Sequence, residues 1–153
     1  MRFLELKIPP VGVFLLAAAA MGGLALAMPG LRVSFTGQLL AASLVLLAAG
    51  LVGLAGVRVF ARHETTVNPL QPERATRLVA AGIYRYSRNP MYLALALALV
   101  AWAVWLGSWP AALVVPAFVL AMNRWQIVPE ERALAALFGA EYEAYRQRVR
   151  RWL

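Results

Sequence analysis

Three long runs without a charged residue dominate this sequence of 153 residues. They cover residues 8–31, 33–57 and 89–123 and contain 24, 25 and 35 residues. About 20 apolar residues suffice for a helix to span the hydrocarbon core of a bilayer. Hydrophobic residues make up 62% of the chain and charged residues 14%, against about 45–50% and about 25% in soluble domains. The sequence therefore predicts an integral membrane protein and excludes both a soluble globular enzyme and a disordered chain.

The lengths of these runs predict four transmembrane helices. The third run is too long for one crossing, and the sequence Gly-Ser-Trp-Pro at residues 107–110 is typical of a turn. This run is therefore expected to form a helical hairpin, with Pro116 kinking its second arm. The predicted spans are residues 9–28, 37–59, 90–106 and 110–127.

The placement of arginine predicts the orientation of these spans. The loop between the first two spans carries only Arg32, and the hairpin turn carries no charge. With four spans, both arginine-rich segments and the N-terminus lie on one side, which the positive-inside rule assigns to the cytoplasm. We expect a bacterial inner membrane, and the net charge of +8 reflects topology and anionic lipids rather than a nucleic-acid partner. The arginines concerned are Arg58, Arg62, Arg74, Arg77, Arg85 and Arg88, and Arg124, Arg132, Arg146, Arg148, Arg150 and Arg151.

Residues 129–152 are predicted to form an amphipathic helix at the cytoplasmic interface. Its apolar residues recur at steps of three and four, the spacing of one helix face. The fold class is thus all-α, with four transmembrane helices, a C-terminal helical hairpin and this interfacial helix. One membrane domain is expected over residues 1–153, with a polar loop at 62–89. The apolar residues of the helix are Leu134, Phe138, Tyr142, Tyr145, Val149 and Trp152.

The residue inventory restricts the available chemistry. The chain has no cysteine and one histidine, so thiolate chemistry and a histidine-rich metal site are not expected. The histidine, His63, has a side chain suited to a general base, although a lone histidine next to a span is also typical of the membrane interface. Gly50, Gly53 and Gly56 share helical spacing in the second span and are expected to let another helix approach closely.

Two polar clusters are expected to meet at one membrane surface. Residues 82–92 bring two arginines and three tyrosines to the start of the third span, where Pro90 suits the first helical turn. Such a helix start can bind an anion, or these residues can form an aromatic belt with snorkelling arginines. The second cluster, residues 123–131, includes Glu130 and Glu131. A hairpin returns the chain to the side where it began, so the two clusters should face each other at that surface. Their carboxylates, tyrosine rings and arginines together favour a site for a ligand with cationic and anionic ends.

The residues of both clusters resemble a known family. Residues 78–92 resemble the signature of integral-membrane methyltransferases, which include isoprenylcysteine carboxyl methyltransferases and phospholipid N-methyltransferases. Glu130-Glu131, Phe138-Gly139, Tyr142 and Tyr145 resemble the closing part of the same pattern. The resemblance covers residues 65–153. It implies methyl transfer from S-adenosylmethionine, with S-adenosylhomocysteine as product, to a lipid-like or prenylated acceptor at the membrane.

The resemblance also implies roles for individual residues. Glu130 would hold the ammonium group of the cofactor, and Glu131 would bind its ribose or another part, or only stabilise the helix start. Arg124 and Gln126 are candidates for catalytic residues near the acceptor. The expected reaction is like that of isoprenylcysteine carboxyl methyltransferases. Phosphatidylethanolamine N-methylation and thiol S-methylation are alternative reactions. A non-catalytic helical membrane scaffold protein is the alternative from a different functional class. The remaining implied cofactor-binding residues are Thr76, Leu78, Val79, Tyr84, Asn89, Pro90, Met91 and Tyr92.

Overall fold

The computed structural model describes residues 5–6, 8–62 and 78–153, and within them it is an all-α membrane protein. The predicted fold class, including the C-terminal helical hairpin, is confirmed. Short 3-10 turns occur at Pro29–Leu31 (η2) and Gly82–Arg85 (η4). The other elements are α1 (Pro10–Ala27), α2 (Gln38–Arg62), α3 (Pro90–Leu106), α4 (Trp109–Ala112), α5 (Val114–Met122), the π-helix η5 (Asn123–Ile127) and α6 (Val128–Arg148).

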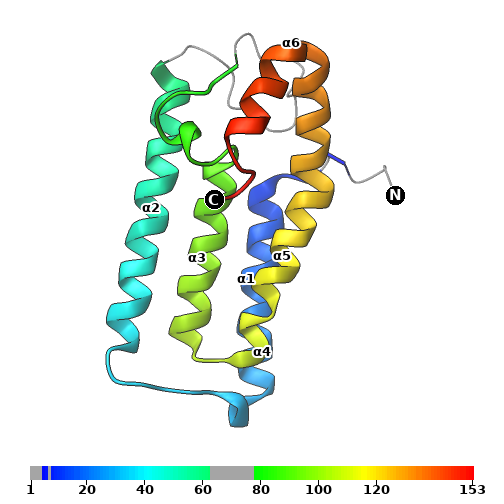
Figure 1. Cartoon of the computed structure of the whole chain (residues 1–153). Coiled ribbons are helices and arrows are strands. Elements are labelled where there is room, and N and C mark those ends of the chain that lie inside the picture. Colours follow the sequence, from blue (N-terminus) through cyan, green and yellow to red (C-terminus); the bar gives the residue numbers. More distant parts are fainter. Residues whose placement is uncertain (1–4, 7, 63–77) are drawn as a thin grey trace.

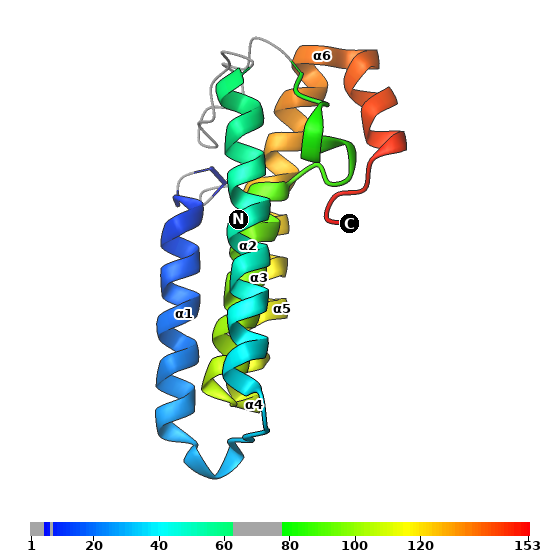
Figure 2. The ribbon, with the colours of Figure 1, turned by 90° about the vertical axis from the view of Figure 1, so that its left-hand side faces the viewer.

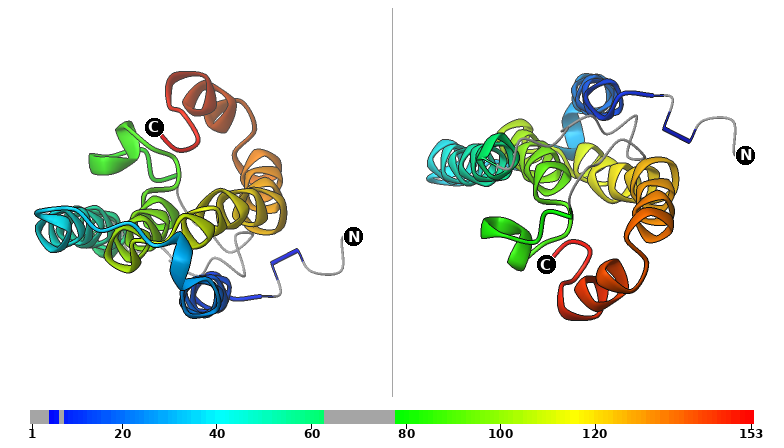
Figure 3. Two further views of the ribbon diagram at one scale, coloured as in Figure 1. Left: turned by 90° about the horizontal axis from the view of Figure 1, so that it is seen from below. Right: turned by 90° about the horizontal axis from the view of Figure 1, so that it is seen from above.

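The helices form an upright bundle, in which α4, α5 and η5 together make the last crossing (Figure 1). Seen along the bundle axis, α2, α3 and α5 lie in a row (Figure 3). Helix α1 covers one side of this row, where it contacts α3, α4 and α5. The segment 78–89 and residues 149–153 lie on the other side. Helix α6 continues upward from the last crossing and then bends back toward the bundle (Figure 2).

The outward faces of the bundle are apolar, as contact with lipid requires. Leu16, Leu26 and Leu40 are more than half exposed, with relative exposures of 70%, 77% and 64%. Helices α1 and α2 and the run from Trp109 are long and apolar enough to cross a membrane. Helix α3 is shorter, with 17 residues or about 26 Å of rise. It is enclosed by the other helices, because it packs against α1, α2, α4 and α5.

The turn between α3 and α4 forms where the sequence predicted it. Gly107 ends α3 in the left-handed conformation, with φ of 60°, which glycine adopts at little cost. Ser108 then caps α4, because its hydroxyl oxygen accepts a hydrogen bond from the Ala111 amide at 3.4 Å. The side-chain amide of Gln38 donates to the carbonyl of Val104 at 2.8 Å. These contacts fix the end of α3 to the start of α2.

The last crossing and the helix after it are both interrupted, the first through the predicted effect of Pro116 and the second where no break was predicted. The break between α4 and α5 falls at Leu113, three residues before Pro116, whose missing N–H leaves the Ala112 carbonyl without a helical partner. The helix predicted over 129–152 is interrupted at Gly139, which has φ of 48°, and it ends at Arg148. Because of this bend, Tyr142 and Tyr145 pack against the segment that precedes α3.

Candidate functional site

The two polar clusters meet through a hydrogen bond between Tyr92 and Glu130. Pro90 begins α3 and places Tyr92 in its first turn, whereas Pro129 places Glu130 in the first turn of α6. The hairpin brings these two helix starts together, and the Tyr92 hydroxyl donates a hydrogen bond to the Glu130 carboxylate. Tyr92 is buried and Glu130 is partly buried. The structure therefore places one carboxylate at the junction of α3 and α6.

The environment of Glu130 favours a neutral carboxyl group. Glu130 lies beyond Ile127, where the apolar part of the last crossing ends. Burial raises the pKa of Glu130 to about 8, the neighbouring charge of Glu131 raises it too, and the hydrogen bond from Tyr92 opposes the shift. A buried carboxyl group with a raised pKa is typical of functional sites. A cation placed beside Glu130 would restore its charge and would be bound in return.

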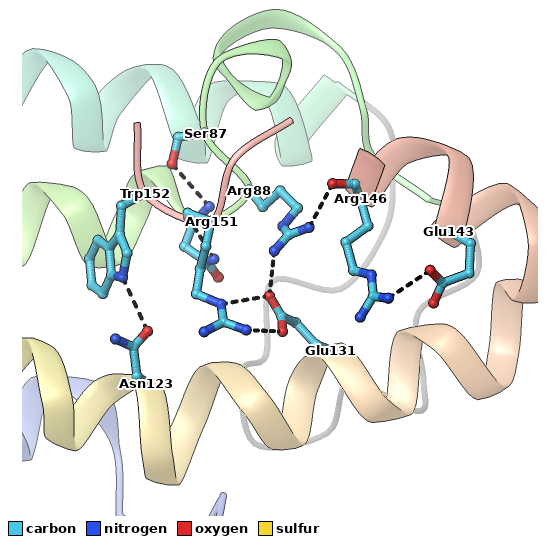
Figure 4. Close-up of polar contacts among 9 residues, drawn as sticks. Ser87, Arg88, Asn123, Glu131, Glu143, Arg146, Arg151 and Trp152 are labelled. Atoms are coloured by element: carbon cyan, nitrogen blue, oxygen red, sulfur yellow. Dashed lines mark hydrogen bonds and ion pairs between the residues drawn. The ribbon is translucent and has the colours of Figure 1, made fainter. Parts of the chain in front are cut away.

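Glu131 points to a different group of residues, which Figure 4 shows. One of its carboxylate oxygens lies 2.8 Å from Nη2 of Arg88, and the other lies 2.7 Å from Nη2 of Arg151. Nε of Arg151 adds a third contact at 3.0 Å. This contact with Glu131 raises the pKa of Arg151. Glu131 thus joins the segment before α3 to the segment after α6.

The segment 78–89 is fixed against α6 and the residues that follow it. The carbonyl of Tyr84 accepts a hydrogen bond from the Tyr145 hydroxyl at 2.8 Å. The Asn89 amide N–H donates to Oγ of Ser87 at 3.1 Å, and its side-chain Nδ2 donates to the carbonyl of Arg151 at 2.9 Å. Leu78 packs on the cluster of Tyr142, Tyr145 and Val149, and Val79 is buried.

Pro90 and Met91 lie at the contact between α3 and α2. A Cβ atom added at Gly56 would lie 3.1 Å from Cγ of Met91 and 3.6 Å from Cγ of Pro90. A Cβ atom at Gly53 would lie 3.3 Å from that of Ala94, whereas at Gly50 it would meet nothing within 4 Å. Gly53 and Gly56 therefore allow the close approach that the sequence predicted, and Gly50 has no part in it.

Arg124 and Gln126 are engaged with the beginning of the chain. Nη1 of Arg124 lies 2.6 Å from the Glu5 carboxylate, which also pairs with Arg132 at 2.5 Å. Nε2 of Gln126 donates to the carbonyl of Ile8 at 2.5 Å, and the Gln126 side chain is fully buried. Within the described ranges 5–6, 8–62 and 78–153, neither side chain forms a hydrogen bond or ion pair with Glu130 or Asn89. Thr76 and His63 lie outside those ranges.

Several residues join the site that sequence reasoning did not assign to it. Arg151 and Trp152 come from the end of the chain, and Nε1 of Trp152 donates to Oδ1 of Asn123 at 3.1 Å. From the sequence, Arg151 contributed only to the predicted orientation in the membrane. The bend of α6 brings the following residues back toward the bundle, and Arg151 therefore reaches Glu131. In the part of the chain that the structure describes, Nε of Arg88 and Oε1 of Gln126 are buried without a hydrogen-bond partner. Such atoms are expensive to leave unpaired, so both are candidates for contact with a ligand.

Part of this chain is similar to known proteins. A family model described as phospholipid methyltransferase matches residues 36–141, which include every predicted site residue. An uncharacterized protein of Haemophilus influenzae is 52% identical over 63 residues, which are 41% of this chain and 100% of that protein. No solved structure matches this chain.

Proposed function

Because this chain belongs to the phospholipid methyltransferase family, we propose that it transfers a methyl group from S-adenosylmethionine to an amphiphilic acceptor in the membrane. The family supports methyltransferase activity, and one structural observation carries the cofactor assignment. The carboxylate of Glu130, bonded to Tyr92, lies where α3 and α6 meet. It has no cationic side chain bonded to it among the described residues, whereas its neighbour Glu131 has two.

The groups at this junction fit the chemistry of the cofactor. S-adenosylmethionine carries an ammonium, a carboxylate, a sulfonium and a nucleoside. Glu130 would pair with the ammonium, and the unpartnered Nε–H of Arg88 is a donor for the carboxylate. Asn89 and Tyr84 would enclose the nucleoside. The other residues proposed for the cofactor are Thr76, Leu78, Val79, Pro90, Met91 and Tyr92, with Glu131 holding the site together through its arginines.

The protein contributes alignment and exclusion of water rather than covalent chemistry. The cofactor supplies a methyl group whose bond to sulfur breaks as its bond to the acceptor forms, and sulfur keeps the electron pair. An ammonium acceptor must first lose a proton, whereas a carboxylate or thiolate acceptor needs no strong base. We assign Arg124 and Gln126 to the acceptor side. The unpartnered Oε1 of Gln126 would accept a hydrogen bond from the head group of the acceptor.

The proposed acceptor is a lipid-like molecule that enters from the bilayer. A prenylated cysteine carboxylate is the leading candidate, and a phosphatidylethanolamine amine or a small thiol is the alternative. The cofactor would enter at the end of the bundle where Arg88, Arg146 and Arg151 gather (Figure 4). On the positive-inside rule we propose that this end faces the cytoplasm, and we propose a bacterial inner membrane as the location of the protein.

Calorimetry with S-adenosylhomocysteine tests the cofactor assignment. The purified protein in detergent and in lipid is expected to bind it, and Glu130→Gln is expected to weaken binding about 100-fold by removing a buried charge. Glu141→Gln, an exposed residue of the same helix, is the matched control and should bind as the wild type does. Absence of binding by folded wild-type protein refutes the cofactor, and equal affinity in Glu130→Gln refutes the role of Glu130.

Transfer of a labelled methyl group identifies the acceptor. The protein is incubated with labelled S-adenosylmethionine and, separately, with a prenylcysteine, phosphatidylethanolamine vesicles or a small thiol. Label in one acceptor, lost in Glu130→Gln, assigns that acceptor. A protein that binds S-adenosylhomocysteine but labels none of these three would refute the proposed acceptor classes.

A further inference from the structure

The chain returns to the candidate site after α6 ends. Helix α6 stops at Arg148, and Val149 takes an extended conformation with φ of −121° and ψ of 130°. Residues 149–153, here called the returning segment, then run beside the start of α3 (Figures 3 and 4). Val149 is buried against Tyr142 and Tyr145. The position of the returning segment is therefore fixed from its first residue.

Two main-chain carbonyls of the returning segment hold the residues immediately before α3. The Arg88 amide donates to the carbonyl of Arg150 at 3.0 Å. Nδ2 of Asn89 donates to the carbonyl of Arg151 at 2.9 Å. Because Nδ2 donates to this carbonyl, the orientation of the Asn89 side-chain amide is set, and Oδ1 is the side-chain atom that could accept a hydrogen bond from a ligand. The returning segment thus determines how a proposed cofactor residue is presented.

Side chains of the returning segment hold the other half of the site. Arg151 makes a bidentate contact with Glu131, at 2.7 and 3.0 Å, and Glu131 is the sequence neighbour of Glu130. Trp152 donates to Asn123 at 3.1 Å and packs on the core cluster that contains Tyr92. A bidentate arginine–carboxylate contact fixes geometry as well as adding energy. Both Asn89 and Glu130 are therefore flanked by residues that the returning segment fixes.

We propose that the returning segment is a positioning element of the methyl-transfer site, with Arg151 and Glu131 as its central contact. In this role Arg151 would not contact the cofactor itself; its carbonyl holds Asn89, and its side chain holds Glu131, beside Glu130. This role rests on the proposed function, because it presupposes that the cofactor binds between Asn89 and Glu130. It predicts that cofactor affinity depends on Arg151 more strongly than overall stability does.

The test compares three substitutions in the full chain. Arg151→Met removes the contact with Glu131, Arg151→Lys keeps the charge but not the paired N–H donors, and Arg148→Met makes the same charge change on the exposed surface of α6. We expect S-adenosylhomocysteine affinity to fall about tenfold or more in Arg151→Met, to fall less in Arg151→Lys, and to stay unchanged in Arg148→Met. The KM for the methyl donor should rise while that for the acceptor stays constant.

Two measurements separate the possible failures. If Arg151→Met binds within twofold of the wild type, or if both KM values rise together, the positioning role is refuted. Hydrogen exchange at the Arg88 amide reports docking of the returning segment without any ligand: it should be slow in the wild type and fast when residues 150–153 are replaced by Gly-Ser-Gly-Ser. Fast exchange in the wild type refutes the docked segment. Failure of the wild type to bind S-adenosylhomocysteine refutes the proposed function instead.

Discussion

The raised pKa of Glu130 predicts that cofactor binding depends on pH and releases a proton. Only the ionised carboxylate pairs with an ammonium group, and in the free protein burial keeps the pKa of Glu130 at about 8. The affinity should therefore follow the ionised fraction of Glu130. With a pKa of about 8, this fraction rises about 16-fold between pH 6.5 and pH 8. The affinity rises by the same factor if the bound ammonium lowers the pKa of Glu130 below this pH range. At pH 7 each binding event should release about 0.9 proton.

Calorimetry of S-adenosylhomocysteine binding measures both quantities. Titrations in phosphate and in Tris at each pH give the affinity, and the difference in observed enthalpy between the buffers gives the protons released. The Glu130→Gln variant should show weak affinity that does not change with pH. A wild type that binds equally at pH 6.5 and pH 8, with the same enthalpy in both buffers, would contradict the assignment of the ammonium to Glu130.

The same shift has a consequence for the stability of the protein without ligand. In the unfolded chain Glu130 releases its proton near its ordinary pKa of 4.5, whereas in the folded protein the pKa is about 8. The folded state therefore binds more protons in this range, so the contribution of Glu130 to stability falls as the pH rises from about 4.5 to about 8. Glu130→Gln should remove this contribution from the pH profile of the unfolding midpoint.

Three further substitutions test the structure around the site. Tyr92→Phe removes the hydrogen bond that lowers the pKa of Glu130, so the pH midpoint of S-adenosylhomocysteine binding should move upward; an unchanged midpoint would deny that this bond matters. Gly56→Leu should lower the free energy of unfolding by about 1–3 kcal/mol through overpacking against Met91. Gly50→Leu, where an added Cβ atom would meet no other described part of the chain within 4 Å, should be neutral in the same denaturation assay. Glu5→Gln breaks two ion pairs with half-exposed arginines, which solvent screens; thermal unfolding should show little change, and a large loss would mean that this contact anchors the N-terminal segment.

The sequence predicted the bundle and the meeting of its polar clusters because these features depend on local signals. Uncharged runs set the crossings, and Gly107 with Pro110 set the turn that sends the chain back. A hairpin then places its two ends at one surface, so Tyr92 and Glu130 had to lie near one another. That topology brings the two residues close, and the structure adds the hydrogen bond between them.

The partners of individual side chains depended on features that the sequence pattern does not reveal. The π-helix Asn123–Ile127 inserts an extra residue into the last crossing, which rotates the residues after it by about 100° relative to a regular α-helix. Phe118, Met122 and Ile127 share one core cluster at spacings of four and then five residues for this reason. A regular helical projection of the crossing therefore misplaces the residues that follow.

The sequence did not predict the returning segment after α6 either, for a different reason. Apolar residues continue at helical spacing through Trp152, so the pattern predicts a helix to that point. The positive φ of Gly139 and the extended Val149 replace it with a bend and a returning segment. The contacts of Arg151 and Trp152 follow from this tertiary arrangement and not from their spacing.

The uncharged turn at residues 107–110 bears on how the protein enters the bilayer. No charged residue lies between Asn89 and Asn123, so α3 and the last crossing can insert together as a pair without carrying a charge through hydrocarbon. The pair formed by α1 and α2 must carry Arg32, at a cost of about 2.5–3.5 kcal/mol at the membrane centre, and Arg32 then donates to the Ala25 carbonyl at 2.9 and 3.1 Å. In the proposed orientation, with both ends of the second pair on the cytoplasmic side, Tyr92 and Glu130 would stay on the side where they are synthesised, so the two halves of the site would not have to cross the membrane to meet.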